Sequence, residues 1–482
     1  MRVSLERLPP ARSSLDVRRT KIVATLGPAT ATAEAVGGLI AAGVDVVRIN
    51  ASHGTAEARA ALVAAARAAS AAAGKPVAVL LDLQGPRIRV GALAAPLTLE
   101  PGGEVVFAPE SAAGPGEVPV TYDLACDVAA GARILIADGL LELDVVAVHP
   151  PRVTARVRVG GPLTSHKGIN LPGVPVSAPC LTDKDRADVA FAVVQGVDYV
   201  GLSFVRRAED VAALRALLPA GARIVAKIEK DAALGDLDRI ADASDAVMVA
   251  RGDLGVELPF EQVPLAQKRV IRVAVTHRRP VITATQMLES MVRAPRPTRA
   301  EASDVANAIW DGTDAVMLSE ETAIGAHPRE AVAAMDRIIR AVEGDRGWRP
   351  APEWLDLTPG APARSEHAVA AAAVAAARML GAPLIVTFTK SGFSARMVAA
   401  NRPGVPVLGV TDTAETCRQL ALVWGVIPVR CDGAPRYDAM LGAARERILS
   451  AGLARPGDRV VVTAGVPFDV PGTTNLVKVE EV

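Results

Sequence analysis

The stretch ARIVAKIEK, residues 222–230, places a lysine and a glutamate at the end of an apolar run. Residues two apart on a β-strand point to the same side, so Lys227 and Glu229 are expected to share one face. A buried ion pair often only breaks even against apolar residues of similar volume, so stability alone is a weak reason to keep it. A structural ion pair stays as the alternative. We favour a functional pair because lysine is rare beside arginine in this chain.

A second carboxylate stands in ARGDLG, residues 250–255, where Gly252 and Gly255 flank Asp253. Glu229 and Asp253 are hard oxygen ligands, and Mg²⁺ is commonly bound by one or two carboxylates while water and substrate oxygens fill its other positions. Lys227 is a compact cation suited to charge on a transferring phosphoryl group. The glycines let the backbone approach an anion, although a glycine turn that opens a helix gives the same pattern.

Polar residues also end the other apolar runs. One run ends in Arg48 and Asn50, followed by Ser52, and the next contains Asp82. Further ends carry Arg251, Thr283, Thr285, Ser319 and Glu321. In a barrel of parallel strands the chemistry gathers at the carboxyl ends, so these side chains are expected at one rim. Thr285 is either part of a proton relay or the cap of a helix that begins near QMLESM.

Eight apolar runs rich in β-branched residues lack the alternation of a half-solvated sheet, as expected for parallel strands covered on both faces. Helical patterns fill most of the intervals, which indicates repeated βα units and an α/β fold built on a (β/α)8 TIM barrel. The runs are residues 21–27, 44–50, 77–85, 197–205, 222–229, 246–253, 280–287 and 315–321.

The interval between the third and fourth runs is long and rich in Pro, Gly and Val. Its short runs are typical of antiparallel strands, so we expect an inserted small β-barrel that acts as a lid. After a Pro-rich linker at residues 345–367, alternating runs predict a C-terminal α/β regulatory domain. The expected division is 1–86 and 176–345 for the barrel, 87–175 for the lid and 346–482 for the C-terminal domain.

Composition excludes several classes of protein. The 482 residues contain 53 Lys+Arg and 53 Asp+Glu, so no strong field of one sign is available to recruit nucleic acid or an anionic membrane. The four cysteines lack any C-x-x-C spacing, which argues against disulfides and zinc and fits a reducing compartment. Residues 1–14 lack the apolar core of a signal peptide. We expect a soluble, cytoplasmic protein that acts on a small molecule.

Seven segments, in order along residues 20–323, together resemble the pyruvate kinase family, and the match continues into the C-terminal part. They are TKIVATLGPAT, VVRINASHG, GINLPG, IVAKIEK, MVARGDLGVELP, VITATQMLESM and PRPTRAEASDVANAIWDGTDAVMLSEETA. The resemblance implies a homotetramer that transfers the phosphoryl group of phosphoenolpyruvate to ADP with Mg²⁺ or Mn²⁺, giving pyruvate and ATP in the last step of glycolysis. Two alternatives stay open: a metal-dependent keto-acid lyase on the same barrel, and a protein that binds phosphorylated metabolites without turnover.

The resemblance also implies a role for each matched residue. Glu229 and Asp253 would bind the divalent metal, and Lys227 would stabilise the phosphoryl group in transfer. The amides of Gly252 and Asp253 would receive the substrate carboxylate, and Thr285 would belong to the relay that protonates the enolate. The remaining implied contacts are Arg48 to phosphate, and Asn50, His53, Arg89 and Lys167 to the nucleotide.

Many members of the family need K⁺, which is bound by residues that match Asn50, Ser52, Asp82 and the carbonyl of Leu83. In LDLQGPRIR, Arg87 stands where K⁺-dependent members usually carry glutamate and K⁺-independent members lysine. We therefore hypothesise that the guanidinium of Arg87 supplies the missing positive charge and that K⁺ is not required. A solvated arginine at the start of the lid is the alternative.

The C-terminal segment TKSGFSARMVAANRP puts Thr389, Ser391 and Ser394 on a turn that enters a helix. Hydroxyls and helix N–H groups together make an anion site. The family uses a matching loop for phosphorylated allosteric effectors, so a phosphate of unspecified origin is expected here. An ordinary helix cap is the alternative, and Phe393 replaces a cation that is common at its position.

Overall fold

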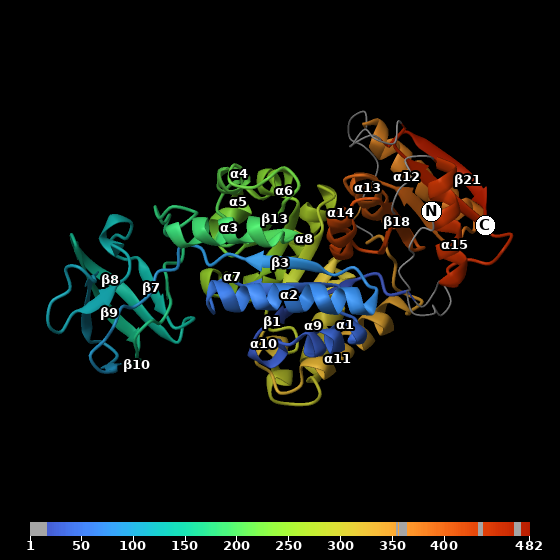
Figure 1. Ribbon diagram of the computed structural model, residues 1–482. Coiled ribbons are helices and arrows are strands. Elements are labelled where there is room, and N and C mark those ends of the chain that lie inside the picture. The colour runs from blue at the N-terminus through green and yellow to red at the C-terminus, as the bar shows by residue number, and fades with distance from the viewer. Residues whose placement is uncertain (1–16, 353–354, 356–363, 432–436, 467–473) are drawn as a thin grey trace.

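The computed structural model describes residues 17–352, 355, 364–431, 437–466 and 474–482. Residues 1–14 and part of the Pro-rich linker lie outside this range. The insert, the barrel and the C-terminal part follow one another from left to right in Figure 1. The expected fold class is confirmed, since a closed parallel barrel is combined with an inserted mixed sheet and a C-terminal α/β part. The residue bounds between these parts stay predictions.

Eight parallel strands close the barrel in the order β1, β16, β15, β14, β13, β12, β3, β2. Each of the eight predicted runs contains one of them. The sixth run was predicted too long, because the chain turns into a helix directly after Ala250. The strands are β1 (Lys21–Leu26), β2 (Val46–Asn50), β3 (Ala78–Asp82), β12 (Tyr199–Leu202), β13 (Arg223–Ile228), β14 (Ala246–Ala250), β15 (Val281–Ala284) and β16 (Ala315–Leu318).

Helices separate the strands and cover the outside of the barrel. They are α1 (Ala33–Ala42), α2 (Ala56–Ala73), α3 (Asp183–Gln195), α4 (Ala208–Arg215), α5 (Asp231–Gly235), α6 (Leu237–Ala243), α7 (Arg251–Glu257), α8 (Val263–Thr276), α9 (Arg299–Trp310), α10 (Glu320–Ala323) and α11 (Pro328–Glu343). Short 3₁₀ turns are η2 (Pro28–Thr30), η4 (Phe260–Gln262) and η5 (Glu289–Val292).

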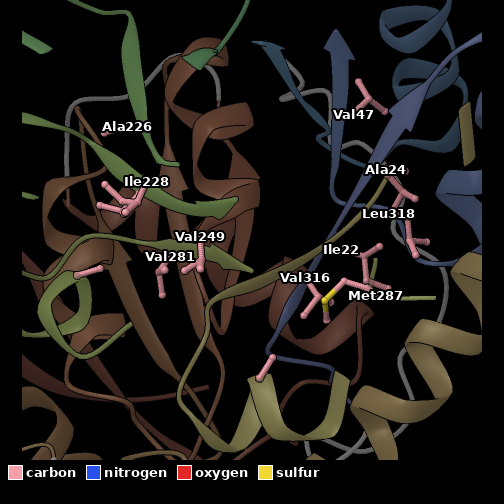
Figure 2. Packing of buried hydrophobic residues seen from close by; sticks show 14 of the residues in the cluster. Ile22, Ala24, Val47, Ala226, Ile228, Val249, Val281, Met287, Val316 and Leu318 are labelled. Carbon is pink, nitrogen blue, oxygen red and sulfur yellow. The ribbon is translucent and has the colours of Figure 1, made fainter. Parts of the chain in front are cut away.

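Alternate residues of each barrel strand face opposite sides. On β13, Val225 belongs to a buried cluster with residues of the other strands at the barrel interior. Its neighbours Ala226 and Ile228 belong to a larger cluster between strands and helices, part of which Figure 2 shows. Lys227 and Glu229 are in phase with Val225, so the same alternation directs both toward the barrel axis.

The insert has its own buried core and a six-stranded mixed sheet in the order β11, β7, β8, β9, β5, β6. Its strands are β4 (Leu97–Leu99), β5 (Glu104–Pro109), β6 (Val118–Val120), β7 (Arg133–Ile136), β8 (Leu141–His149), β9 (Arg152–Val159), β10 (Gly161–Leu163) and β11 (Ile169–Asn170), with η3 at Leu124–Cys126. The expectation of antiparallel pairing was wrong for β5 and β6, which pair in parallel.

The strand pairing leaves β11 and β6 at the two edges of this sheet, but the short segment that contains Arg89 and Val90 bridges them. Val90 N–H donates to Lys167 O, and Thr121 N–H donates to Arg89 O. Isolated bridges join the same segment to Gly168 on one side and to Val120 on the other. The insert is therefore a barrel-like ring that is completed by a bridging segment instead of a full strand.

The insert interrupts the barrel between two neighbouring strands. β3 pairs directly with β12, with Asp82 opposite Gly201, although the whole insert lies between them in the chain. The last residues of β3 and the turn after β12 therefore lie at the base of the lid.

The C-terminal part is a five-stranded sheet in the order β19, β18, β17, β20, β21, in which β21 pairs antiparallel to β20. Its strands are β17 (Ile385–Phe388), β18 (Val407–Thr411), β19 (Val426–Arg430), β20 (Arg459–Ala464) and β21 (Leu476–Glu481). Its helices are α12 (Ser365–Leu380), α13 (Phe393–Ala400), α14 (Ala414–Gln419) and α15 (Tyr437–Ser450), with η6 at Leu420–Leu422. Within the described residues, the helices all fall short of the length and apolarity needed to cross a membrane.

The first residues of the barrel strands bind the C-terminal part. Lys21 Nζ donates to Val426 O at 2.7 Å, and Tyr199 Oη donates to Gln419 O at 2.7 Å. Arg223, which begins β13, donates to a main-chain carbonyl of the loop before α13 at 3.1 Å. The C-terminal part thus covers the amino ends of the strands and leaves their carboxyl ends to the lid.

Candidate active site

Lys227 and Glu229 lie side by side at the end of β13 and are 7% and 1% exposed. Lys227 Nζ is 2.8 Å from Glu229 Oε1 and 3.2 Å from Asp82 Oδ1. It also donates a hydrogen bond of 2.8 Å to Ser203 Oγ. The period of two in the sequence correctly predicted that the two side chains share a face, and the structure adds a second carboxylate to the pair.

The surroundings of this pair favour the charged form of Lys227 and disfavour the charged form of Glu229. Burial disfavours the charged form of Lys227, but the carboxylates of Asp82 and Glu229 outweigh burial and raise its pKa. Burial also raises the pKa of Glu229, and the negative charges of Asp253 and Asp82 raise it further against the opposing effect of Lys227. Lys227 is therefore held as a cation, while Glu229 lies in a field that a further cation would relieve.

This crowding of carboxylates fits a divalent metal. Glu229 and Asp253 are close enough for the charge of one to disfavour ionisation of the other. Among the described residues there is no group of three or more His, Cys, Asp or Glu side chains able to hold a metal. A cation at this site would have few protein ligands and would take the rest from water and substrate, as Mg²⁺ commonly does.

Gly252 and Asp253 lie in the first turn of α7, where backbone N–H groups have no partner within the helix. A Cβ atom at Gly252 would lie 3.0 Å from Thr285 Cγ2, so the glycine permits the close approach of α7 to the residue after β15. Arg251 fixes this junction, because it donates to Thr285 O at 2.6 Å and lies 2.7 Å from Asp304 Oδ2.

Thr285 has a positive φ of 75° and follows the last residue of β15. The alternative that it caps the next helix is wrong. That element is the short 3₁₀ turn η5, its cap position is Leu288, and no side chain caps it. Because the chain bends at Thr285, its side chain belongs to the cleft wall rather than to a helix start.

The half-buried Arg48 pairs with the buried Asp82 at the ends of β2 and β3. Arg48 Nε donates to Asp82 Oδ2 at 2.7 Å, and Nη1 donates to Thr25 Oγ1 at 3.1 Å. Burial would raise the pKa of Asp82, but Lys227 and Arg48 outweigh it and lower that pKa. Asp82 therefore stays ionised between two cations.

Two of the other residues named for K⁺ accept from protein donors. Asn50 Oδ1 accepts from the Ser52 N–H at 3.0 Å, and Leu83 O accepts from Ser203 Oγ at 2.7 Å. Asp82 Oδ1 lies 3.2 Å from the Lys227 ammonium. These oxygens gather at neighbouring strand ends, since Asn50 lies opposite Asp82 in the ladder.

His53 is exposed and lies within electrostatic reach of three guanidinium groups. Burial and the positive charges of Arg87, Arg89 and Arg48 lower the pKa of His53. Desolvation and the charge of Arg87 likewise lower the pKa of Arg89. This concentration of positive charge at the base of the lid favours a polyanionic ligand such as a nucleotide phosphate.

A cleft of about 1000 Å³ separates the lid from the carboxyl end of the barrel. The predicted residues that line it are Arg87, Arg89, Arg251, Gly252, Asp253, Gly255, Thr285, Ser319 and Glu321. Lys227, Glu229 and Asp82 are not in its lining and lie buried at the strand ends, beside the half-buried Arg48. The predicted residues Asn50, Ser52, His53, Leu83 and Lys167 are also outside the lining, although His166 and Gly168 on either side of Lys167 belong to it.

Sequence reasoning missed several residues of this region. Asp138 and His166 reach the cleft from left-handed positions in the lid, and Phe204 and Lys230 reach it from the barrel. Ser203 is buried against Lys227. The only signal for this last contact was a serine within the apolar run GLSFV, which standard strand patterns do not distinguish from a satisfied core hydroxyl.

The predicted effector residues lie in the opposite part of the molecule, Thr389 and Ser391 between β17 and α13 and Ser394 in the first turn of α13. Ser394 Oγ lies 2.7 Å from Thr474 Oγ1, and both Ser394 and Thr389 are buried. The carbonyl of Ser391 accepts from Arg223. The alternative of an ordinary side-chain cap is wrong, because Gly392 occupies the cap position of α13 without any side-chain hydrogen bond.

Comparisons with known proteins cover both ends of the chain. A family model described as pyruvate kinase, barrel domain, matches residues 17–332, and one described as pyruvate kinase, alpha/beta domain, matches residues 367–480. A pyruvate kinase of Agrobacterium vitis is 44% identical over 469 residues, which are 96% of this chain and 97% of that protein. A pyruvate kinase of Geobacillus stearothermophilus is 45% identical over 475 residues, or 96% of this chain and 80% of that protein.

Proposed function

The chain belongs to the pyruvate kinase family, whose members transfer the phosphoryl group of phosphoenolpyruvate to ADP, and from this premise we propose how its own residues divide the reaction. The protein is a phosphotransferase that forms pyruvate and ATP. The observation that carries the assignment of residues is the pairing of Lys227 with Glu229 inside the barrel mouth, 2.8 Å apart and beside the charge of Asp253.

Glu229 and Asp253 hold the divalent metal, Mg²⁺ or Mn²⁺. The donor set supports this assignment, because two hard carboxylates repel each other at this point and leave room for water and substrate oxygens. When bound, the metal supplies positive charge at the oxygens of the enolpyruvate and of the phosphoryl group. Lys227 beside it opposes the rise in the pKa of Glu229 that burial causes, and so favours the ionised form.

Lys227 places its ammonium where negative charge develops on the phosphoryl group. In-line transfer through a loose transition state needs positioning and charge neutralisation more than a nucleophile of the protein. The raised pKa of Lys227, in which the carboxylates of Asp82 and Glu229 outweigh burial, keeps the ammonium charged at neutral pH. Arg48 binds the phosphate from the end of β2 and is itself oriented by Asp82.

The carboxylate of phosphoenolpyruvate binds the free amides of Gly252 and Asp253. Thr285 faces the same part of the cleft and belongs to the relay that delivers a proton to the enolate. ADP binds toward the lid, through Asn50, His53, Arg89 and Lys167. The positive charge around His53 supports the nucleotide assignment.

K⁺ is not required, because Arg87 supplies a permanent positive charge at the start of the lid. Two observations support this proposal. The guanidinium of Arg87 is near enough to His53 and Arg89 to act on both electrostatically. Of the oxygens that would bind K⁺, those of Asn50 and Leu83 accept from protein donors, and that of Asp82 faces Lys227.

The decisive experiment measures pyruvate release from phosphoenolpyruvate with Mg²⁺ in buffer free of K⁺, with and without ADP. We expect release only with ADP, with less than a twofold change when K⁺ is added at constant ionic strength. Release without ADP would show that the phosphoryl group passes to water instead of to ADP, and no release under any condition would favour a keto-acid lyase or a binding protein; the comparisons favour neither. A large stimulation by K⁺ would refute only the proposal that Arg87 replaces K⁺.

A pair of variants tests the metal assignment in the same assay. Asp253→Asn keeps the size of the side chain but removes a charged ligand, so we expect the catalytic efficiency to fall by at least about 10²-fold. Asp144→Asn is the control, because Asp144 lies on β8 of the lid with 43% of its side chain exposed. Equal activity of the two variants would refute the metal role of Asp253.

We also propose that the turn with Thr389, Ser391 and Ser394 binds the phosphate of an allosteric effector, that the protein is a homotetramer and that it acts in the cytoplasm. The buried hydroxyls of the turn and its contact with Arg223 support the first proposal. Titration of candidate sugar phosphates and nucleotides with and without phosphoenolpyruvate tests it, since coupling between the two sites must be reciprocal. Light scattering behind size-exclusion chromatography tests the tetramer.

A further inference from the structure

The turn directly after β12 contacts both members of the Lys227–Glu229 pair. Ser203 and Phe204 form this turn and are 2% and 8% exposed. Ser203 Oγ accepts from Lys227 Nζ at 2.8 Å and donates to Leu83 O at 2.7 Å. The N–H of Phe204 donates to Glu229 Oε2 at 2.5 Å. Two adjacent residues thus hold the ammonium by a side chain and the carboxylate by the main chain.

The backbone of Phe204 adopts a conformation that this residue type rarely takes. Its φ is +55°, a left-handed value that is unfavourable for a bulky side chain and persists only where the surroundings hold it. Strain of this kind is common at functional sites. Here the conformation directs the N–H toward Glu229 while the side chain turns to the base of the lid.

The ring of Phe204 packs where the chain leaves the barrel for the lid. A Cβ atom at Gly85 would lie 2.7 Å from Phe204 Cδ2, so only glycine fits against the ring in this arrangement. The N–H of Gly85 donates to Asp185 Oδ1 at 3.0 Å, which ties this point to the start of α3. On the other side, Lys230 Nζ lies 5.5 Å from the ring centroid.

Both oxygens of Glu229 are therefore oriented before any metal binds. Oε1 faces Lys227 and Oε2 accepts from Phe204, so the carboxylate has one preferred rotation. Protein groups that orient a metal ligand in this way commonly contribute about 10- to 100-fold to metal affinity or activity. No such orienting partner other than these two is evident for Glu229 in the described part of the chain.

We propose that Ser203 and Phe204 are positioning residues with separate tasks: Ser203 aims the Lys227 ammonium at the phosphoryl group, and Phe204 holds Glu229 for the metal and links it to the base of the lid. The proposal rests on the metal and phosphoryl roles assigned above. It predicts that substitution of Phe204 weakens metal binding, whereas substitution of Ser203 lowers kcat. A general loss of packing would not separate these two effects.

Direct binding of Mn²⁺, followed by electron paramagnetic resonance without substrates, tests the task of Phe204. Phe204→Gly releases the left-handed backbone and removes the ring, so we expect Mn²⁺ to bind about tenfold more weakly. Arg278→Gly is the matched control, because Arg278 has a similar φ of 56° far from Glu229 in the chain. We expect this control to bind Mn²⁺ as the unaltered protein does.

Glu229→Gln distinguishes a failure of this proposal from a failure of the metal role assigned to Glu229. If Glu229→Gln leaves Mn²⁺ affinity unchanged, the metal assignment fails. If it weakens Mn²⁺ binding while Phe204→Gly does not, only the present proposal fails. Should Phe204→Gly not fold, Phe204→Asn takes its place, because Asn also tolerates left-handed backbone and also removes the ring. The Asn variant must then bind Mn²⁺ more weakly than the unaltered protein.

Steady-state kinetics test the task of Ser203. Ser203→Ala removes the acceptor for Lys227 but no contact of Glu229, so we expect kcat to fall about tenfold while Mn²⁺ affinity changes less than about twofold. Ser203→Thr keeps the hydroxyl and restores most of kcat. Equal loss of Mn²⁺ affinity in Ser203→Ala and Phe204→Gly, or unchanged kcat in Ser203→Ala, would overturn the division of tasks.

Discussion

Replacing Lys227 by methionine separates its effect on the metal site from its effect on the reaction. Lys227 Nζ lies 2.8 Å from Glu229 and 3.2 Å from Asp82, whose side chains are each 1% exposed. Burial already raises the pKa of Glu229, Asp253 and Asp82 add to that rise, and Lys227 is the group that opposes it. In Lys227→Met this opposition is gone, so the pKa of Glu229 rises further.

The consequence is a metal affinity that depends on pH. A metal binds the ionised carboxylate, so each pH unit below the pKa of Glu229 weakens binding about tenfold, or about 1.4 kcal/mol. In Lys227→Met we therefore expect Mn²⁺ binding to strengthen as the pH rises, by up to about tenfold per unit below the pKa of Glu229. The unaltered protein should show a smaller dependence over the same range.

Lys227→Arg is the matched variant. It keeps a permanent charge near both carboxylates, so Mn²⁺ binding should follow the pH dependence of the unaltered protein. Its planar guanidinium is not a compact point charge, however, and kcat should remain about 10²- to 10³-fold low in both variants. Electron paramagnetic resonance gives the metal affinity and pyruvate release gives kcat. Binding of Mn²⁺ to Lys227→Met with unchanged affinity at every pH would refute the electrostatic reasoning.

Three further predictions follow. Arg87→Glu should create a requirement for K⁺, seen as more than about tenfold stimulation of pyruvate release; equal rates with and without K⁺ would exclude Arg87 as the built-in cation. His277 lies 2.8 and 2.9 Å from two aspartates of α6. Their hydrogen bonds outweigh burial and raise the pKa of His277. The protonated imidazole therefore stabilises the fold at pH below 6.5, and this contribution is lost as the pH rises through the pKa of His277 in the folded protein. The difference in melting temperature between the unaltered protein and His277→Gln should therefore shrink from pH 5.5 to 8.5, and a constant difference would contradict this. Arg402→Met should lower the midpoint of urea unfolding by an amount equivalent to about 3–5 kcal/mol, because it leaves Asp314 buried without its partner at 3.0 Å. Arg402→Met combined with Asp314→Asn should recover part of that loss, and a double variant as unstable as the single one would show that packing dominates.

The barrel was predictable because its strands carry a strong local signal. Runs such as VDVVRIN and VDYVGLSFV are apolar on both sides, and the spacing of eight such runs leaves few alternatives to a closed parallel barrel. The shared face of Lys227 and Glu229 followed from the period of two alone. These inferences succeeded because they use only the geometry of a single strand.

The rest depends on contacts between strands and turns that have no local signature. The sequence does not reveal that Phe204 takes a left-handed backbone, or that its N–H meets a carboxylate 25 residues later. Apolarity also failed to show that β14 stops at Ala250, because Arg251 and Gly252 suit a helix start as well as a strand end. The same limit led to the wrong alternative of a helix cap at Thr285.

The pairing of β3 with β12 across the insert has a consequence for how the chain folds. Joining two strands that are roughly a hundred residues apart costs more chain entropy than joining neighbours, by about 2 kcal/mol relative to a loop of about ten residues. The insert has a core of its own, so once it has folded its two ends lie close together and most of that penalty disappears. Barrel closure should therefore follow folding of the lid, and a substitution that weakens the lid core should slow refolding of the barrel more than it speeds unfolding.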